Sequence, residues 1–157
     1  MEKLVFDSGI KEYQIGDGGV LRFNPSDPNV YARFMDAQPA IEAVQEKLTE
    51  EAKSIEDSAN PDATGGAVLQ LMAKADKEIK QILSNIFGGD NDFDEILCGV
   101  NLLAIAGNGQ MVITNLLNAL QPIMVAGAER CAKRQAGNAV AAAKQNRAQR
   151  RAKKKHR

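Results

Sequence analysis

Apolar residues recur at helical spacing along most of the chain. From residue 30 to about residue 55 they fall at steps of three and four, which places them on one face of a helix. The same spacing recurs over residues 68–86, where Gly88-Gly89 follow as a stop signal, and again over residues 110–128. The pattern therefore predicts three long helices, each with an apolar face to bury.

The first 24 residues show a different, alternating pattern. Short alternating runs at residues 4–6, 13–15 and 20–23 predict strands, and the glycine-rich residues 16–19 predict a hairpin turn between the last two. Pro25 and Pro28 then end the strand pattern, and Ser26 or Asp27 is the expected N-cap of the first long helix.

Several residues are expected to interrupt the helices. Pro39 predicts a kink or a break near Gln38, and Pro122 predicts a bend in the last apolar helix. Residues 58–66 have the composition of a linker, and residues 93–99 predict a short helix with acidic residues in its first turn.

The fold class that follows is mainly α (α+β). Residues 1–128 are expected to form a single helical domain with a small β-hairpin element over residues 1–24. Residues 129–157 form a basic arm rich in Ala, Lys and Arg, expected as an exposed extended helix that frays into a disordered end. Aromatic residues make up only 4% of the chain, with no Trp, so the core must be mostly aliphatic.

Charge divides the chain at the same place. Residues 1–129 hold all 20 acidic residues and nine of the 20 basic ones, a formal charge of −11, while the last 28 residues hold 11 basic residues and no acidic one. Such an arm could neutralise phosphates, but it has no aromatic residue for base stacking, so nucleic-acid binding would be nonspecific. The alternatives are a solubilising tail or a tail held against the protein's own acidic body or an acidic partner. The candidate contact residues are Lys144, Arg147, Arg150, Arg151, Lys153, Lys154, Lys155 and Arg157.

The residues for covalent catalysis or a cofactor site are missing from the sequence. The one histidine, His156, lies in the basic arm, and Cys98 and Cys131 are too far apart to form a CxxC motif, which excludes a Cys/His zinc site and a disulfide framework. The glycine-rich segments match no nucleotide-binding motif. We therefore expect neither an enzyme nor a cofactor, and the cysteine pattern makes a reducing cytosol the default expectation. Neither a signal peptide nor a membrane-spanning segment is expected.

Two sets of acidic residues have spacings that could indicate a functional site. Asp90, Asp92 and Asp94 resemble the start of a calcium loop, but Glu95 and Asn101 stand where that loop needs glycine and glutamate, so an acidic helix start is the better interpretation. The acidic pairs at residues 50–51 and 56–57 lie at a polar helix end, where a solvated face is expected rather than an acid/base pair.

The order of these parts resembles the small tail assembly chaperones of long-tailed phages and Gram-positive prophages. The resemblance rests on residues 23–34 (FNPSDPNVYARF), residues 86–99 (IFGGDNDFDEILCG), the apolar helix that follows, and residues 146–151 (NRAQRR). It spans roughly residues 1–128 and, more loosely, the arm, and its motifs are structural rather than catalytic.

This resemblance implies a non-enzymatic protein of the bacterial host cytoplasm that binds the tape measure protein and keeps it soluble while tail tube proteins assemble. Apolar stripes on helices could cover a helical client reversibly and would also permit self-association. Family members often have a longer frameshifted product, so an A-rich slippery run encoding residues 153–155 is a hypothesis for the coding DNA. The candidate client contacts, each of which could instead belong to the core, are Val30, Phe34, Ile41, Val44, Leu48, Leu116, Leu117 and Leu120.

The rival hypothesis is a nucleic-acid-associated phage structural protein that binds through the basic arm. Gene position would separate the two, since a chaperone gene should lie between the tail tube gene and a very long tape measure gene. No membrane partner is expected.

Overall fold

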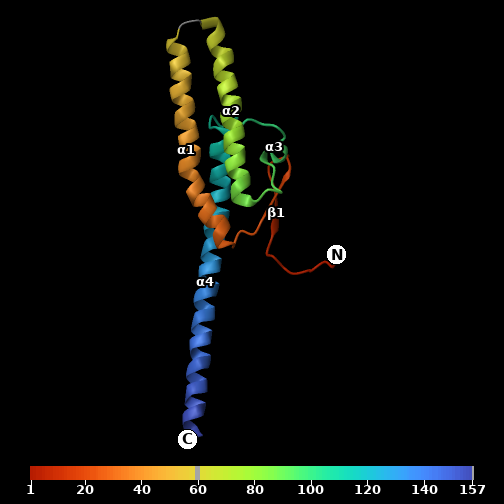
Figure 1. The fold of residues 1–157 in the computed structure, drawn as a ribbon, viewed down its shortest axis with the longest axis vertical. Helices are drawn as coiled ribbons and strands as arrows, with labels where there is room; N and C mark the ends of the chain where they lie inside the picture. Colours follow the sequence, from red (N-terminus) through yellow and green to blue (C-terminus); the bar gives the residue numbers. More distant parts are fainter. Residues whose placement is uncertain (59–60, 157) are drawn as a thin grey trace.

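The computed structural model describes residues 1–58 and 61–156, and the side chains of residues 1–58 and 65–156. It confirms the mainly α fold with a small β element. Helices α1 and α2 lie against each other as a long hairpin, the first part of α4 packs beside them, and the rest of α4 projects away from the body (Figure 1). The elements in chain order are β1 (Lys11–Gln14), β2 (Val20–Phe23), α1 (Pro28–Asp57), α2 (Pro61–Phe87), α3 (Phe93–Ile96) and α4 (Val112–Lys155).

The predicted hairpin is present, with β1 and β2 antiparallel and Tyr13 opposite Leu21. Its turn closes through a hydrogen bond of 3.0 Å from the Ile15 N–H to the Gly19 carbonyl. The Gly19 N–H in turn donates to the Ile96 carbonyl at 2.8 Å, which fastens the turn to α3. A Cβ at residue 19 would lie 2.8 Å from the Ile96 Cα, so the close approach of the two backbones requires glycine there.

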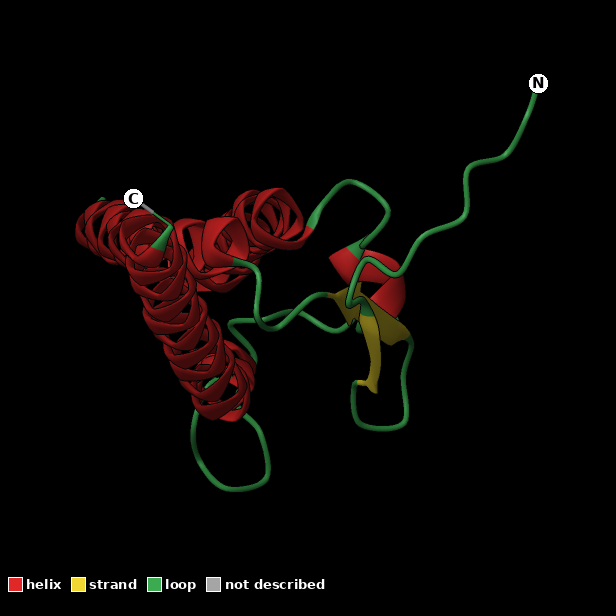
Figure 2. Cartoon of the chain, turned by 90° about the horizontal axis from the view of Figure 1, so that it is seen from below, coloured by secondary structure: helices red, strands yellow, loops and turns green. Residues whose placement is uncertain are grey.

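The strand predicted at residues 4–6 is wrong. Residues 1–10 form an extended segment outside the sheet, and Leu4, Val5 and Phe6 are 85%, 81% and 74% exposed. Alternation alone cannot make a strand, because the segment has no neighbouring chain to pair with. Figure 2 shows this segment leading away from the hairpin and α3, which lie together on one side of the long helices.

Helix α1 begins where the sequence indicates. The Asp27 carboxylate accepts a hydrogen bond of 2.8 Å from the Asn29 N–H, and Pro28 occupies the first turn. The helix continues through Pro39, so of the predicted kink or break the break does not occur. Both Pro39 and Met35, whose carbonyl loses its helical donor, lie exposed, so water can satisfy that carbonyl.

The linker predicted over residues 58–66 is also wrong in part. Ser58 ends α1, residues 59–60 lie outside the described residues, and α2 already begins at Pro61. Proline suits the first helical position because it lacks an N–H, and an N–H at that position has no partner within the helix. The two glycines at 65 and 66 cost about 1 kcal/mol each relative to alanine, and the packing of the rest of α2 against α1 outweighs that cost.

The core lies where α1, α2, α4 and the hairpin meet. A chain of aromatic rings links the hairpin to the end of α2 and to α3, with ring centroids 5.1 Å apart for Tyr13 and Phe23, 4.7 Å for Phe23 and Phe87, and 5.8 Å for Phe87 and Phe93. Aliphatic side chains fill the remainder, as the low aromatic content requires. The fully buried large residues are Phe34, Phe93, Leu21, Ile79, Leu83, Ile86, Leu102, Ile113 and Met124.

Helix α4 serves both the body and the arm. It runs through Pro122, which is exposed, without interruption, and its last buried residue is Gly127. Residues 132–156 are exposed, yet the helix extends to Lys155, so the arm is helical almost to the end of the described residues, and the predicted end at Arg157 lies outside them. Alanine, lysine, arginine and glutamine all favour helix, which explains how an arm that buries no face can remain helical.

Candidate protein-binding surface

Five of the eight candidate client contacts are core residues, so for these five the core alternative holds and not the client-facing one. Val30, Phe34 and Ile41 are 4%, 1% and 2% exposed on the inner face of α1, and Leu116 and Leu120 are 7% and 2% exposed on α4. Their helical spacing is real, but the stripe it draws is covered by the neighbouring helices.

The other three predicted contacts are half-buried at the margin of the core. Val44 and Leu48 border a cavity of only about 20 Å³ between α1 and α2, which has room for about one water molecule. Leu117 packs against the core from α4. None of these three by itself forms a groove that could hold a client side chain.

A larger apolar groove lies between the β-hairpin and the first part of α4. It has a volume of about 340 Å³ and its lining is mostly apolar. Tyr13 and Ile15 form one wall, Val112 and Ile123 form the other, and Leu97 closes the end near α3. Gln14 and Asn115 also line it, and the buried Leu116 and Leu120 border it, so two predicted residues reach the groove.

The sequence did not point to this groove. Its walls come from residues about 100 positions apart in the chain, and Tyr13 and Ile15 carry only a strand signal. The half-burial of Tyr13, Ile15, Leu97, Val112 and Ile123 is what distinguishes them from the fully buried core.

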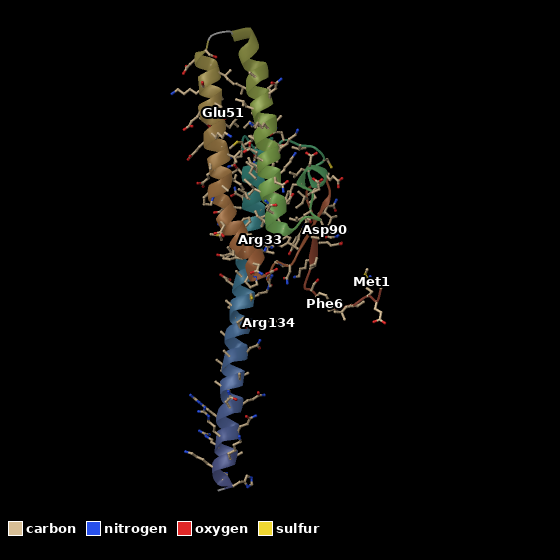
Figure 3. The ribbon with its side chains drawn as sticks, in the orientation of Figure 1. Met1, Phe6, Arg33, Glu51, Asp90 and Arg134 are labelled. Carbon is tan, nitrogen blue, oxygen red and sulfur yellow. The ribbon has the colours of Figure 1, made fainter. Side chains whose placement is uncertain are left out.

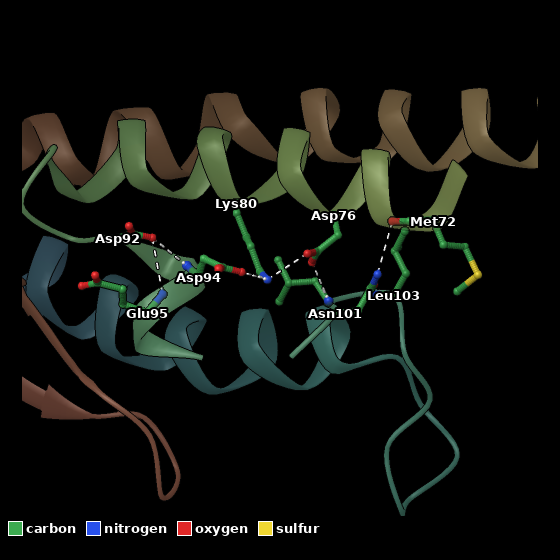
Figure 4. Close-up of polar contacts among 9 residues, drawn as sticks. Met72, Asp76, Lys80, Asp92, Asp94, Glu95, Asn101 and Leu103 are labelled. Carbon is green, nitrogen blue, oxygen red and sulfur yellow. Dashed lines mark hydrogen bonds and ion pairs between the residues drawn. The ribbon is translucent and has the colours of Figure 1, made fainter. Parts of the chain in front are cut away.

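A buried polar network joins α2 to α3 and to the loop after it (Figure 4). The Lys80 ammonium lies 2.8 Å from the Asp76 carboxylate and 2.7 Å from that of Asp94. Asp76 also accepts a hydrogen bond of 2.7 Å from the Leu102 N–H. The side chains of Lys80 and Asp76 are 7% and 10% exposed, whereas that of Asp94 is 68% exposed.

The charge state of this network favours a structural role. Burial lowers the pKa of Lys80, but its hydrogen bonds to Asp76 and Asp94 and the attraction of both carboxylates outweigh that effect and hold the pKa above its usual value. A lysine that acts as a base or nucleophile needs a lowered pKa, so this ammonium is suited to fixing a loop and not to proton transfer. Sequence reasoning missed the network, although an Asp and a Lys four residues apart beside the apolar stripe of α2 were its signal.

The three aspartates that resemble a calcium loop have separate positions and tasks. Asp92 caps α3 by accepting a hydrogen bond of 2.9 Å from the Asp94 N–H, and Asp94 pairs with Lys80. Asp90 is exposed. Among the side chains described, those of residues 1–58 and 65–156, no three of His, Cys, Asp or Glu are grouped so that they could hold a metal ion.

The basic residues of the arm are exposed along α4. Figure 3 shows Arg134 where α4 leaves the body, and the side chains beyond it point into open space. Within the described part of the arm no basic residue forms an ion pair. Of the predicted contact residues, Arg157 lies outside the described residues, and the exposed ones are Lys144, Arg147, Arg150, Arg151, Lys153, Lys154 and Lys155.

Among the helices described, none is both long and apolar enough to cross a membrane. No protein-family model matches the chain, and neither curated proteins nor solved structures include a match to it.

Proposed function

We propose that this protein is a non-enzymatic tail assembly chaperone of a phage or prophage, which binds the tape measure protein in the host cytoplasm and keeps it soluble. The observation that carries this proposal is the apolar groove between the hairpin and α4. Its volume of about 340 Å³ is at the lower end for sites that enclose a ligand or a small group of side chains. The phage assignment rests on the sequence segments that resemble the chaperone family.

The chemistry of the groove suits an aliphatic helical client. Its walls present Ile15, Leu97, Val112 and Ile123 without any charged side chain, so a client buries apolar residues there while its charged face stays in water. A groove of this size offers modest binding energy, and tail tube proteins could therefore displace the chaperone as they assemble.

Co-expression with the tape measure protein encoded beside this gene tests the proposal. We expect Ile123→Asp to reduce the amount of soluble client captured at least about tenfold, because it places a carboxylate in an apolar site. Val125→Asp is the matched control, since Val125 lies on the same helix, is 41% exposed and does not line the groove. The complex should also survive roughly 0.5 M salt, where charge pairs are screened within about 4–5 Å.

The proposal is refuted if Ile123→Asp and Val125→Asp capture the client equally, or if no soluble complex forms at all. Deletion of residues 144–157 gives a further check, because a groove-based chaperone should keep its client without the arm.

The second candidate function is nonspecific nucleic-acid binding, favoured by the exposed basic residues of the arm that pair with no acid in the described chain. Each phosphate contact should make the affinity fall with rising salt. Electrophoretic retention of duplex DNA at about 50 mM and 200 mM salt, with and without residues 144–157, tests it. Retention that does not depend on the arm would refute this candidate.

A further inference from the structure

The opposite charges of this molecule occupy opposite ends. The outward face of α1 carries Glu42, Glu46 and Glu50, which are all exposed and take part in no ion pair among the described residues. Steps of four residues advance only about 40° around a helix, so these carboxylates form one stripe. It lies on the far side of α1 from the buried stripe of Val30, Phe34 and Ile41.

A matching basic stripe runs along the free part of α4. Lys144, Arg147, Arg151 and Lys154 follow each other at steps of three and four and are all exposed. This stripe is about 15 Å long at 1.5 Å per residue, and the acidic stripe from Glu42 to Glu50 is about 12 Å long, so the two are similar in length.

The two stripes cannot meet within one molecule. Helix α4 is a single helix of 44 residues, about 66 Å long, and its free part carries the basic stripe away from the body. Figure 1 shows α1 running toward the α1–α2 tip while α4 runs in the opposite direction. Folding the arm back onto α1 would break α4, so the attraction is available only between molecules.

We infer that the basic arm of one molecule binds the acidic face of α1 in a second copy of this chain. Copies that point the same way place the arm antiparallel to the next copy's α1, an arrangement that also aligns the two helix dipoles favourably. The contact is head-to-tail, because each copy uses a different surface toward each neighbour, and repetition produces a ring or a filament. This self-assembly uses neither the apolar groove nor any client, and it is independent of the proposed function.

The experiment measures the mass of the full chain by light scattering during size exclusion, after nuclease treatment, at about 50 mM and 500 mM salt. We expect oligomers at low salt and monomers at high salt, since the screening length falls from about 14 Å to about 4 Å. One variant reverses the arm (Lys144→Glu, Arg147→Glu, Arg151→Glu) and a second reverses α1 (Glu42→Lys, Glu46→Lys, Glu50→Lys). Each alone should be monomeric at low salt, with association at least roughly tenfold weaker.

Mixing the two reversed variants is the decisive step. The acidic arm of the first then meets the basic α1 of the second, and the reverse pairing is complementary too, so the mixture should regain oligomers. The matched control reverses three exposed acids elsewhere, Glu2→Lys, Asp17→Lys and Asp90→Lys, for the same change in net charge, and it should still associate.

Four results would overturn the inference: a monomer at low salt, oligomers that persist at 500 mM salt, oligomers that disappear with nuclease, or reversed variants that stay monomeric when mixed. Loss of association in the control variant would also overturn it, because net charge and not the α1 face would then be responsible. Circular dichroism of each variant checks that its helix content equals that of the wild type.

Discussion

Replacement of Gly127 by alanine should destabilise the protein although it improves helix propensity. A Cβ at this position of α4 would lie 1.6 Å from the Pro25 carbonyl oxygen and 2.5 Å from its carbon. Contacts of a real Cβ are not shorter than about 3.0 Å, so α4 and the segment before α1 must separate by about 1.4 Å. That separation would loosen the packing of Phe23 and Val30, which flank the segment and are 2% and 4% exposed.

The magnitude follows from two opposing terms. Forcing an atom into a packed contact costs typically 1–3 kcal/mol, and the upper value of about 3 kcal/mol applies here because the obstacle is backbone. The change from glycine to alanine in a helix returns about 1 kcal/mol. The net loss of about 2 kcal/mol in the free energy of unfolding corresponds to a fall of about 4–8 °C in Tm for a chain of this size.

Thermal and urea unfolding followed by circular dichroism measure this difference. Gly137→Ala is the matched control, because residue 137 lies further along the same helix and a Cβ there meets nothing within 4 Å. We expect that control to keep the Tm of the body and to gain slightly in helix content. If Gly127→Ala is as stable as the wild type, α4 does not approach Pro25 as closely as described and the reasoning fails.

Three further predictions concern the buried ion pair, its pH dependence and the arm. Lys80→Met should cost about 3 kcal/mol in urea unfolding, because it leaves the Asp76 carboxylate buried beside an apolar group. The hydrogen bond from Lys80 and its charge hold the pKa of Asp94 below its usual value, so the stability Asp94 contributes is present above the unfolded pKa and lost as pH falls through the folded one. Wild type and Asp94→Asn should therefore differ in stability near pH 6 and converge toward pH 2, and a constant difference would contradict this assignment. Gly137→Pro should interrupt α4 inside the exposed arm. We expect the Tm of the body and the retention of DNA to stay unchanged, and head-to-tail association to weaken. Equal loss of DNA retention and of association would refute the need for a rigid arm.

Local features of the fold could be predicted because local chemistry decides them. The hairpin turn at residues 16–19 needs only glycine and a pair of flanking strands, and the N-cap at Asp27 needs only an acceptor next to a free N–H group. The periodic stripes correctly located the helices for the same reason. The strand prediction at residues 4–6 failed because a strand also needs a neighbouring strand to pair with.

The candidate site could not be predicted from periodicity. An apolar stripe has the same spacing whether another helix or solvent lies opposite it. The sequence therefore cannot distinguish the core residue Phe34 from the groove residue Ile123. The contact between Gly127 and Pro25 and the bond between Asp76 and Leu102 join residues far apart in sequence. Only the folded chain brings such pairs together.

The continuity of α4 links the separate parts of the molecule. Its first turns form the wall of the apolar groove, Gly127 fixes it against the start of α1, and the same helix then carries the basic arm outward. Because the backbone contact at Gly127 leaves no room for a side chain, the direction in which the arm leaves the body is set by packing and not by the arm itself. An arm with a fixed direction can meet a particular helix of a second copy, whereas a flexible tail with the same charges could bind only a diffuse polyanion. The structural distinction between these two roles therefore lies in the rigidity of α4 between residues 127 and 144 and not in the number of its basic residues.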